Sequence, residues 1–436
     1  MIRRPKRVAS KQSGALGAGT CNVALLGFGT VGSSVAKILC ERSNTDLRLT
    51  HVLNRNVARK KVDWLPSSVE WTENIDDVLS SNAEIVVEVM GGLQPTEDWI
   101  RRAFKSGKSV VTANKQLIAQ RGTELVSLAR RMNQQIQFGA SVAGGVPVIS
   151  GLHEGLAGDE LFKIFGILNG TCNYILSQIE TNGIPFATAL REAQKLGFAE
   201  ADPTEDIEGL DARAKLAILA RVGLHCNVKP DSIMAHSISA IDSVDFEYAN
   251  QLGCTIRQIS RAELQGDNLF AAVQPALVEL SSPLARVEGS QNLVVATGTY
   301  GGETVFGGHG AGGHPTAVAV VSDILAIARS KRSAMTTMTE APVEKTPTVT
   351  AELTAKHYLR FLVKDRPGII ARLATILSHC HINIDAVVQK PGCPKSHLPF
   401  LITLEECKAS LVEQALQKIN SLDFQVQPCL HLPILE

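Results

Sequence analysis

The feature that most constrains the fold is a glycine-rich turn near the start of the chain. An apolar run at residues 22–27 leads into the turn, and residues 33–41 follow with apolar side chains at helical spacing. The turn reads GxGxxG and consists of Gly27, Phe28, Gly29, Thr30, Val31 and Gly32. A strand, such a turn and a helix in this order form the dinucleotide-binding fingerprint, in which the glycines allow a tight turn, close approach of a pyrophosphate and close helix–strand packing.

This order predicts an α/β fold that opens with a Rossmann domain. All six turn residues are predicted to contact the cofactor, whose phosphates would lie at the helix N-terminus, where free N–H groups and the helix dipole attract anions. A glycine turn with a purely structural role is the alternative reading of the same pattern.

The end of the second predicted strand bears on the choice of cofactor. Residues 48–53 form this strand, and Asn54, Arg55 and Asn56 follow it, with no acidic residue before Asp63. An NAD site usually has Asp or Glu here, bonded to the ribose hydroxyls. Arg55 suits the 2′-phosphate of NADP instead, because a guanidinium pairs well with phosphate oxygens. We therefore expect NADP, with NAD possible, against the alternative that Arg55 belongs to a solvated basic helix start.

Two further strands are predicted at residues 85–89 and 109–112. The first is followed by Gly91-Gly92 and the second continues as Thr112-Ala113-Asn114-Lys115. Ligands bind at the carboxyl edge of such a parallel sheet, so Gly91 and Lys115 are predicted to contact the cofactor. Glu88, at the end of an apolar strand, is expected to be structural.

Beyond this domain, two segments are predicted to contain strands. Residues 138–149 read as a strand that leaves the nucleotide domain through a glycine turn, and residues 166–174 as a strand whose polar end enters a helix. Thr171 is the expected N-cap of that helix, since Thr is a good capping residue.

The richest stretch for chemistry is acidic and lies between Glu200 and Asp211. Pro203 and Gly209 divide it into a loop and a following helix, and Lys215 lies four residues after Asp211, on the same helix face. On a solvated surface this would be an ordinary ion pair. In a cleft, the carboxylate would hold the ammonium group in place to deliver a proton, and Glu200 could bind a substrate ammonium group.

At this point residues 197–215 resemble the signature of the homoserine dehydrogenases. Three more motifs are similar to those of the family and follow its order: Thr-Ala-Asn-Lys at 112–115, Asn-Gly-Thr-x-Asn at 169–173, and the glycine-rich segment at 308–317. The resemblance implies the NAD(P)H-dependent, reversible reduction of L-aspartate 4-semialdehyde to L-homoserine, a step of threonine, methionine and isoleucine biosynthesis. Two other functions stay open: a reductase of another amino-acid semialdehyde, and a non-catalytic sensor of nucleotides and amino acids.

The resemblance also implies residue roles. Lys215 would be the proton donor, with Asp211 and Lys115 beside it, and Gly310 would contact the cofactor through its backbone. The implied substrate-binding residues are Glu200, Asp211, Thr171 and Asp206. Family members usually associate as dimers, so a homo-oligomer, dimer or tetramer, is expected.

Members of the family carry a monovalent cation, expected to be sodium, held largely by backbone oxygens. The matching positions are Gly139, Val142, Gly144 and Val146. The family usually has Glu where Gly139 stands. If the backbone carbonyl at position 139 binds the cation, glycine still provides that ligand. If the Glu carboxylate binds it, the ligand is absent from this chain.

The C-terminal part reads as a ferredoxin-like unit of order β-α-β-β-α-β. Its predicted elements are residues 357–363, 369–379, 382–389, 399–404, 410–419 and 424–429. Asp365-Arg366-Pro367-Gly368 and residues 381–384 resemble the ACT family, which implies binding of a small amino acid. Threonine, the end product, is the expected effector, with Asp365 and Asn383 as contacts. A purely structural dimerisation module is the alternative, and the insert at 390–397 adds length beside the expected site.

These patterns predict five consecutive regions. They are a flexible tail (1–20), a nucleotide-binding Rossmann domain (21–145, completed by 310–332), an α+β catalytic and dimerisation domain (146–309), a linker (333–354) and an ACT domain (355–436).

Composition excludes several other classes of protein. The 43 basic and 43 acidic residues balance, which argues against nucleic acid or a membrane surface as a partner, and there is no apolar run long enough to span a bilayer. Nine scattered cysteines without a CxxC pair indicate reduced thiols in a cytoplasmic protein. The basic, acid-poor N-terminus permits a transit peptide but lacks an amphipathic run.

Overall fold

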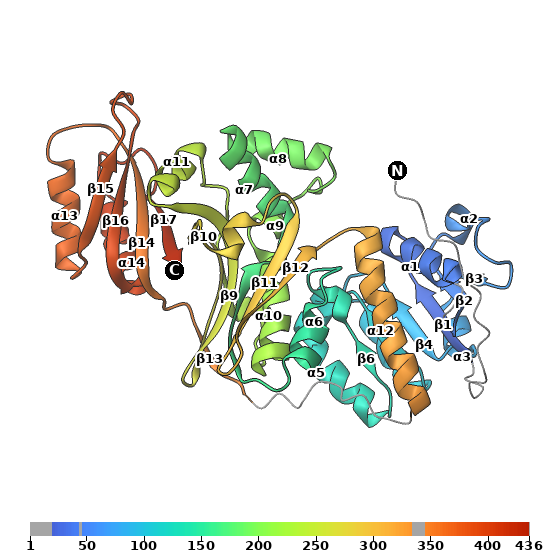
Figure 1. Ribbon diagram of the computed structural model, residues 1–436. Coiled ribbons are helices and arrows are strands. Elements are labelled where there is room, and N and C mark those ends of the chain that lie inside the picture. Colours follow the sequence, from blue (N-terminus) through green and yellow to red (C-terminus); the bar gives the residue numbers. More distant parts are fainter. Residues whose placement is uncertain (1–19, 43–45, 334–344, 436) are drawn as a thin grey trace, which may run out of the picture.

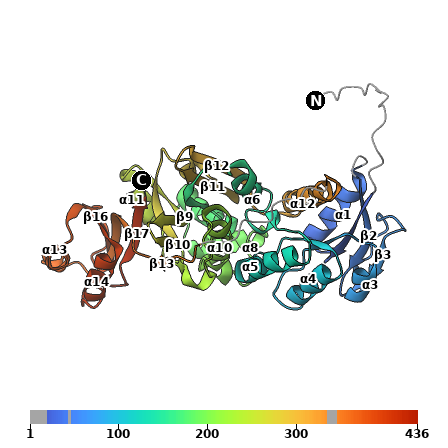
Figure 2. The ribbon, with the colours of Figure 1, turned by 90° about the horizontal axis from the view of Figure 1, so that it is seen from below.

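The computed structural model describes residues 20–42, 46–333 and 345–435. The molecule is elongated, with a nucleotide-binding unit at one end, a central mixed sheet and a small C-terminal unit at the other end (Figure 1). Figure 2, a view from below, shows the same three parts in a row. The predicted tail and residues 334–344 of the predicted linker lie outside the described residues, apart from residue 20 of the tail.

The first unit is built on a six-stranded parallel sheet of order β3-β2-β1-β4-β5-β6. This confirms the predicted Rossmann architecture. Its strands are β1 (Cys21–Leu26), β2 (Leu47–Leu53), β3 (Glu70–Thr72), β4 (Ile85–Glu88), β5 (Ser109–Thr112) and β6 (Ile136–Gln137). The connecting helices are α1 (Thr30–Glu41), α2 (Val57–Lys60), α3 (Ile75–Ser80), α4 (Thr96–Lys105) and α5 (Lys115–Arg131). The strand order reverses between β1 and β4, so the carboxyl ends of these two strands define the expected ligand crevice.

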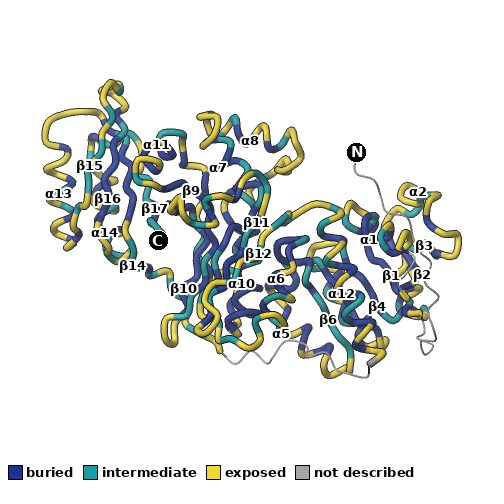
Figure 3. The backbone as a smooth tube through the Cα atoms, in the orientation of Figure 1, coloured by how far each residue is buried: buried dark blue, intermediate teal, exposed yellow. Residues whose placement is uncertain are grey.

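Burial follows the pattern of a sheet that is covered on both faces. All four residues of β4 and all four of β5 are buried, and β1 is buried except at Asn22. Figure 3 shows the buried backbone along β1 and β4. Parallel strands in this setting read as continuous apolar runs rather than as alternating ones. Glu88 and Thr112, at the ends of β4 and β5, are buried polar residues in this otherwise apolar layer.

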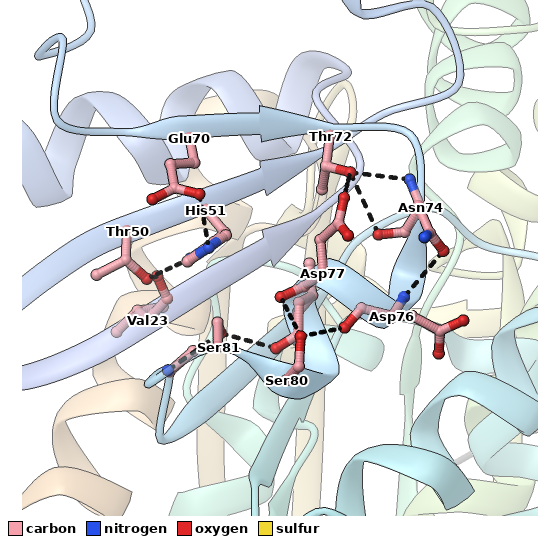
Figure 4. A network of polar contacts seen from close by, with 12 residues as sticks. Val23, Thr50, His51, Glu70, Thr72, Asn74, Asp76, Asp77, Ser80 and Ser81 are labelled. Atoms are coloured by element: carbon pink, nitrogen blue, oxygen red, sulfur yellow. Dashed lines mark hydrogen bonds and ion pairs between the residues drawn. The ribbon is translucent and has the colours of Figure 1, made fainter.

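Short polar contacts close the outer edge of this sheet (Figure 4). The Thr50 hydroxyl donates to the carbonyl of Val23 at 3.2 Å, and His51 lies 3.5 Å from the Glu70 carboxylate of the edge strand β3. Asn74 caps α3 by accepting the N–H of Asp76 at 3.1 Å. Side chains thus tie the loop after β3 to the edge of the sheet.

A late helix, α12 (Gly313–Ser333), returns to this first unit. It packs along α1, and its apolar side chains join those of β1, β2 and α1 in one core. The helix begins at Gly313, where a Cβ would lie 2.9 Å from the Ser34 hydroxyl. Only glycine lets the two helices approach so closely.

The second sheet spans the rest of the molecule. Its order is β12-β11-β7-β9-β10-β17-β14-β16-β15. The central strands are β7 (Leu161–Ile167), β9 (Cys254–Gln265), β10 (Asn268–Glu279), β11 (Gln291–Gly298) and β12 (Gly302–His309). Helices α7 (Gly170–Asn182), α10 (Leu210–Leu224) and α11 (Ser243–Gln251) pack on these strands. The sheet is therefore an extended base that carries α10.

The C-terminal unit continues the same sheet and has the predicted ferredoxin-like order. It consists of β14 (Thr354–Val363), α13 (Ile369–His379), β15 (Ile384–Gln389), β16 (Leu398–Lys408), α14 (Ala409–Ile419) and β17 (Leu430–Leu435). A short parallel pairing of Leu277 with Ile434 and Val278 with Leu435 joins β10 to β17. The end of the chain thus connects the C-terminal unit to the central sheet.

A buried ion pair fixes these two parts to each other. Asp245 of α11 is fully buried and accepts hydrogen bonds from Arg360 Nε at 2.6 Å and from the Tyr358 hydroxyl at 2.7 Å. Arg360 also donates to the carbonyl of Ala240 at 2.8 Å. Burial raises the pKa of Asp245, and the Arg360 guanidinium opposes this effect. Removing either partner would leave a buried charge without compensation.

Three predicted elements are wrong. Residues 138–149 do not continue as a strand, because Ala143 and Gly144 both have positive φ (52° and 45°); a 3₁₀ turn (Gly139–Ser141) and a short helix, α6 (Val148–Ser150), take their place. The last strand is β17 rather than 424–429, because the Phe424 side chain turns into the core. Residues 348–350 of the predicted linker form β13 (Thr348–Thr350), which pairs with β10.

In the part of the chain that the structure describes, no helix combines the length and the apolar character that crossing a membrane requires.

Candidate active site

The glycine turn has the geometry that a bound pyrophosphate requires. A Cβ on Gly32 would lie 2.1 Å from the carbonyl oxygen of Gly27, which itself has φ of 100°, so neither position accepts a larger residue without strain. A Cβ on Gly29 would meet nothing within 4 Å. The turn is therefore tight on its inner side and open where α1 begins. The residues fit a dinucleotide, with the N–H groups of Thr30 and Val31 at the first turn of the helix.

Asn54 positions this turn, and the sequence analysis gave it no role. Its side-chain oxygen accepts the N–H of Phe28 at 3.2 Å, and the Phe28 ring packs edge-on against Trp71 at 4.8 Å. Arg55 follows Asn54 at the end of β2 and is exposed. Arg59 and Lys60 on α2 and the following Lys61 are exposed as well, so this edge of the crevice is basic.

Glu88 and Asn114 shape the loops at the ends of β4 and β5. The buried Glu88 carboxylate accepts the N–H groups of Met90 at 2.7 Å and Gly91 at 3.0 Å, as well as the Thr112 hydroxyl. Burial raises the pKa of Glu88, although these donors act in the opposite direction. Asn114 donates to the carbonyl of Gly92 at 2.6 Å and caps α5. Gly91 and Lys115 are thereby held at one edge of the sheet, and Glu88 has the structural role expected of it.

The centre of the site is a carboxylate held between two ammonium groups. Asp211 is 3% exposed and accepts Lys215 Nζ on one oxygen at 2.6 Å and Lys115 Nζ on the other. Lys215 is also largely buried and donates to the carbonyl of Leu168 at 2.8 Å. Lys115 comes from α5 and the other two residues from α10, so the cluster joins the nucleotide-binding unit to the central sheet. The reading of Asp211 and Lys215 as a surface ion pair is wrong, because both are shielded from solvent.

The charges in this cluster stabilise one another. Burial alone would raise the pKa of Asp211, but the ammonium groups of Lys215 and Lys115 lower it well below its usual range. Burial would likewise lower the pKa of Lys115, but Asp211 outweighs this effect and the pKa is raised. The carboxylate form of Asp211 is thus favoured, and it holds the side chains of Lys115 and Lys215 close together where α5 and α10 meet.

Asn169, the first residue of the 169–173 motif, extends the cluster, a role that the sequence did not predict. Its amide nitrogen donates to Asp206 at 2.6 Å and to Asp211 at 2.9 Å, while its oxygen accepts the N–H of Cys172 at 2.8 Å. Asn169, rather than Thr171, is thus the N-cap of α7, and the expected capping role of Thr171 is wrong. Asn is among the best N-caps, and its position before Gly170 was the signal that could have identified it.

The other predicted substrate contacts lie around this cluster. The Thr171 hydroxyl donates to the carbonyl of Phe198 at 2.7 Å, which ties the loop that carries Glu200 to the start of α7. Asp206 reaches the cluster through Asn169. Glu200 is exposed on its loop. Among the described residues, its carboxylate makes no ion pair with Lys115 or Lys215, so the structure leaves Glu200 beside the cluster rather than in it.

The predicted cation-binding segment lies against the glycine-rich strand end. A Cβ on Gly144 would lie 2.5 Å from the carbonyl oxygen of Gly310, and Gly310 itself is crowded by Asn292, whose side-chain oxygen would lie 1.6 Å from an added Cβ. The carbonyl of Val146 accepts the N–H of Val148 at 2.8 Å, so it already has a partner. Over the described ranges, no three His, Cys, Asp or Glu side chains are grouped to hold a metal. A cation here would depend on backbone oxygens such as those of Val142 and Gly144.

Gly139 faces a carboxyl group from another part of the chain. Its N–H donates to Asp323 of α12 at 2.8 Å, and a Cβ at Gly139 would lie 2.8 Å from the other oxygen of Asp323. Asp323 thus fills the space into which a side chain at position 139 would point. Burial raises the pKa of Asp323 to about 7, against the Gly139 N–H and with some contribution from Glu154.

We expect Asp323→Asn to change how stability depends on pH. Folding raises the pKa of Asp323 from its ordinary value of 3.8 to about 7. The protonated Asp323 side chain therefore contributes its full stabilisation of the folded state below pH 3.8, and this contribution is lost as pH rises through about 7. The melting temperature of the variant relative to wild type should therefore rise between about pH 5 and about pH 8. The exposed Asp63→Asn is the control. An equal difference at both pH values would show that Asp323 ionises normally.

The two predicted effector contacts do not meet within one chain. Asp365 follows β14 beyond the pairing of Val363 with Leu398, whereas Asn383 precedes Ile384, which pairs with Leu404. Six residues along β16 separate these positions, about 20 Å at the usual rise of a strand. Asn383 donates to Glu405 at 3.0 Å. One small ligand cannot contact both residues in the same protomer.

Comparison with protein families gives three matches in sequence order. Residues 27–139 match the model described as homoserine dehydrogenase, NAD binding domain. Residues 147–325 match the model described as homoserine dehydrogenase, and residues 357–424 match the ACT domain. The first range contains the glycine turn and Lys115, and the second contains Asp211 and Lys215. The third covers most of the C-terminal ferredoxin-like unit but ends before β17.

Individual relatives cover nearly the whole chain. The homoserine dehydrogenase of Bacillus subtilis is 36% identical over 92% of this chain and 95% of its own length. The crystal structure of a homoserine dehydrogenase from Thiobacillus denitrificans is 32% identical, with a TM-score of 0.87 over 95% of this chain and 98% of that one. A hyperthermophilic archaeal homoserine dehydrogenase, solved in complex with NADPH, is 27% identical, with a TM-score of 0.61 over 71% of this chain and 98% of its own.

Proposed function

The chain belongs to the homoserine dehydrogenase family, and from that premise we propose that it reduces L-aspartate 4-semialdehyde to L-homoserine with NADPH, by proton delivery from Lys215. The observation that carries the mechanism is the shielded carboxylate of Asp211 between two lysines from different parts of the chain. A non-catalytic sensor has no need for a shielded lysine held by a carboxylate. An oxidoreductase that forms an alkoxide needs an ammonium group to stabilise and protonate that oxygen.

In the proposed step the aldehyde group of the substrate gains one hydride at carbon and one proton at oxygen. A nicotinamide dinucleotide held by the glycine turn would supply the hydride for the carbonyl carbon of the substrate. Lys215 Nζ stabilises the negative charge that develops on the carbonyl oxygen and transfers a proton to it, which leaves a neutral amine that regains a proton from solvent. In the reverse direction the neutral amine accepts the hydroxyl proton.

The surrounding residues position the reacting groups. Asp211 holds Lys215 at 2.6 Å, and the carbonyl of Leu168 accepts a second N–H from the same ammonium group. Lys115 adds positive charge at the side of the nucleotide crevice, and Asp206 is held by Asn169. Glu200 is proposed to bind the ammonium group of the substrate, with Thr171 fixing its loop. A sodium ion on the backbone of residues 139–146 is part of the proposal as well.

Initial rates test the reaction and the cofactor choice together. Homoserine oxidation by the purified protein should be faster at low NADP+ than at equal NAD+, and sodium in place of potassium should raise the rate. A protein that reduces another semialdehyde, but not aspartate semialdehyde, would overturn the proposed substrate.

We expect Arg55→Ala to weaken the preference for NADP+ over NAD+ by about 10–100-fold, the range for losing charge-assisted hydrogen bonds to a phosphate. The ratio of kcat/KM for the two cofactors measures this change. Arg59→Ala, a neighbouring exposed arginine, should alter the ratio much less. An unchanged ratio in Arg55→Ala would remove Arg55 from cofactor recognition.

Regulation and assembly complete the proposal. The ACT unit is proposed to respond to threonine, and the protein to act as a homo-oligomer, a dimer or tetramer, in the cytoplasm. All nine cysteines are unpaired, as a reducing compartment would require. Light scattering after size-exclusion chromatography measures the assembly, and rates with and without threonine measure the response.

A further inference from the structure

An exposed tryptophan lies beside the glycine turn, on the loop between α2 and β3. Trp64 is 48% exposed, whereas tryptophan usually buries most of its large apolar surface. The centroid of its ring lies 6.1 Å from that of Phe28, and the two ring planes are inclined at 31°. Phe28 belongs to the glycine turn and is buried. The exposed indole therefore adjoins the part of the site where a dinucleotide is expected.

Packing of the loop does not account for this exposed side chain. Leu65 and Val69 are buried in the core that β1, β2 and α1 form, so these two residues anchor the loop. Trp71 of β3 makes the closer contact with the Phe28 ring, edge-on at 4.8 Å. Trp64 thus adds an apolar surface that the fold itself leaves uncovered.

The strand order determines which half of a dinucleotide would lie here. In folds of this kind, residues that follow the second strand bind the ribose of the adenosine half. Asn54 and Arg55 follow β2, whereas Lys115 follows β5, on the other side of β1 and β4. The nicotinamide half would therefore extend toward Lys115. The adenine ring would lie toward α2 and β3, at the end of the molecule away from the central sheet (Figure 1).

The groups at this edge fit an adenine base attached to a phosphorylated ribose. Arg55 is exposed here, and so are the two basic residues of α2, so the edge attracts phosphate. The Trp64 indole adds a flat aromatic surface of the kind on which bases stack. Met90, 36% exposed, brings a second apolar side chain to the turn, since its Cγ would lie 2.8 Å from a Cβ on Gly27. Basic and apolar groups thus occur together, as the two parts of a nucleotide require.

From these contacts we infer that the adenine ring of the cofactor stacks on the indole of Trp64. Arg55 and Trp64 then have different tasks. Arg55 distinguishes NADP from NAD, because only NADP carries the 2′-phosphate. Stacking on Trp64 adds affinity for both cofactors equally, because both carry the same adenine. The inference rests on the proposed use of a nicotinamide dinucleotide, but it concerns binding and is measured without turnover.

The first experiment titrates the full chain with adenosine 2′,5′-bisphosphate and follows tryptophan emission. This fragment has no nicotinamide and does not absorb the light that tryptophan emits, so quenching requires contact with an indole. We expect saturable quenching in wild type and its loss in Trp64→Phe, which calorimetry should show still binds the fragment. If wild type shows no quenching, or if Trp64→Phe is quenched equally through Trp71 or Trp99, the inference is wrong.

Calorimetric dissociation constants measure the contribution of stacking. Trp64→Ala should raise the dissociation constant of adenosine 2′,5′-bisphosphate about 5–150-fold, the range for losing one base–aromatic contact. Trp64→Phe keeps a flat aromatic ring and should stay within about fivefold of wild type. Met132→Ala is the matched control, because Met132 is a 39% exposed apolar residue of the same unit, and it should bind like wild type. Wild-type affinity in Trp64→Ala would contradict the inference.

The two cofactors separate stacking from the other roles that Trp64 could have. Trp64→Ala should weaken binding of NADP+ and NAD+ by the same factor and so preserve their ratio, whereas Arg55→Ala should change the ratio. A loss confined to NADP+ would show that Trp64 acts on the phosphate, and the inference would be wrong. A protein that does not oxidise homoserine would leave the fluorescence and calorimetric results intact, so the two proposals fail separately.

Discussion

Lys215→Met is expected to lower kcat for homoserine oxidation by about 10²–10⁴-fold, the usual contribution of a positioned proton-transfer group. The reason is geometric, because the ammonium group of Lys215 on α10 is largely shielded and is held in place by Asp211 and the carbonyl of Leu168. Methionine has a similar length but no proton to give. Asp211 keeps Lys115 as a partner in the variant, so the carboxylate is not left without a cation.

The measurements for this variant must separate chemistry from binding. Fluorescence titration with NADPH should give a dissociation constant within a few-fold of wild type, because Lys215 is not part of the glycine turn. Lys195→Met, the same change at an exposed lysine of α8 (Phe186–Lys195), is the matched control and should be fully active. If Lys215→Met kept the wild-type kcat, Lys215 would have no part in proton transfer.

The largest effect on stability is expected from Asp245→Ala. Arg360 is 4% exposed, and Asp245 is its carboxylate partner. Breaking a buried pair from one side usually costs about 3–5 kcal/mol, since the remaining charge cannot be hydrated. The Tyr358 hydroxyl loses its acceptor as well. The C-terminal unit should therefore separate from α11 at lower denaturant concentration.

Urea unfolding, followed by limited proteolysis at increasing urea, measures this separation. The fragment that contains α14 should be released well before the nucleotide-binding unit unfolds. Asp231→Ala is the control: it removes the exposed partner of Arg213, a pair at 2.9 Å on the surface, where about 1 kcal/mol or less is expected. Equal effects of the two substitutions would mean that the buried pair does not hold the C-terminal unit.

Local patterns predicted the parts of the molecule that depend on neighbours in sequence. The glycine turn, the parallel strands that end at Gly91 and Lys115, and the spacing of Asp211 and Lys215 each have a local physical cause, and the structure contains all of them. The ferredoxin-like order of the C-terminal unit followed from alternating apolar residues in the same way.

Contacts between distant segments could not be predicted in this way. Lys115 and Asp211 are 96 residues apart, and Asp323 reaches Gly139 from 184 residues away. Asn169 was noticed as part of a motif, but its bonds to Asp206 and Asp211 depend on how α7 meets α10. The last strand was misplaced because burial of Phe424 resembles the burial of a strand residue.

The most direct test of the account is the stoichiometry of NADPH oxidation with L-aspartate 4-semialdehyde. We predict that one NADPH is consumed for each L-homoserine formed by wild type, and that Lys215→Met consumes NADPH at a rate about 10²–10⁴-fold lower while still binding it. No consumption with this aldehyde by wild type, or equal rates for wild type and Lys215→Met, would contradict the account.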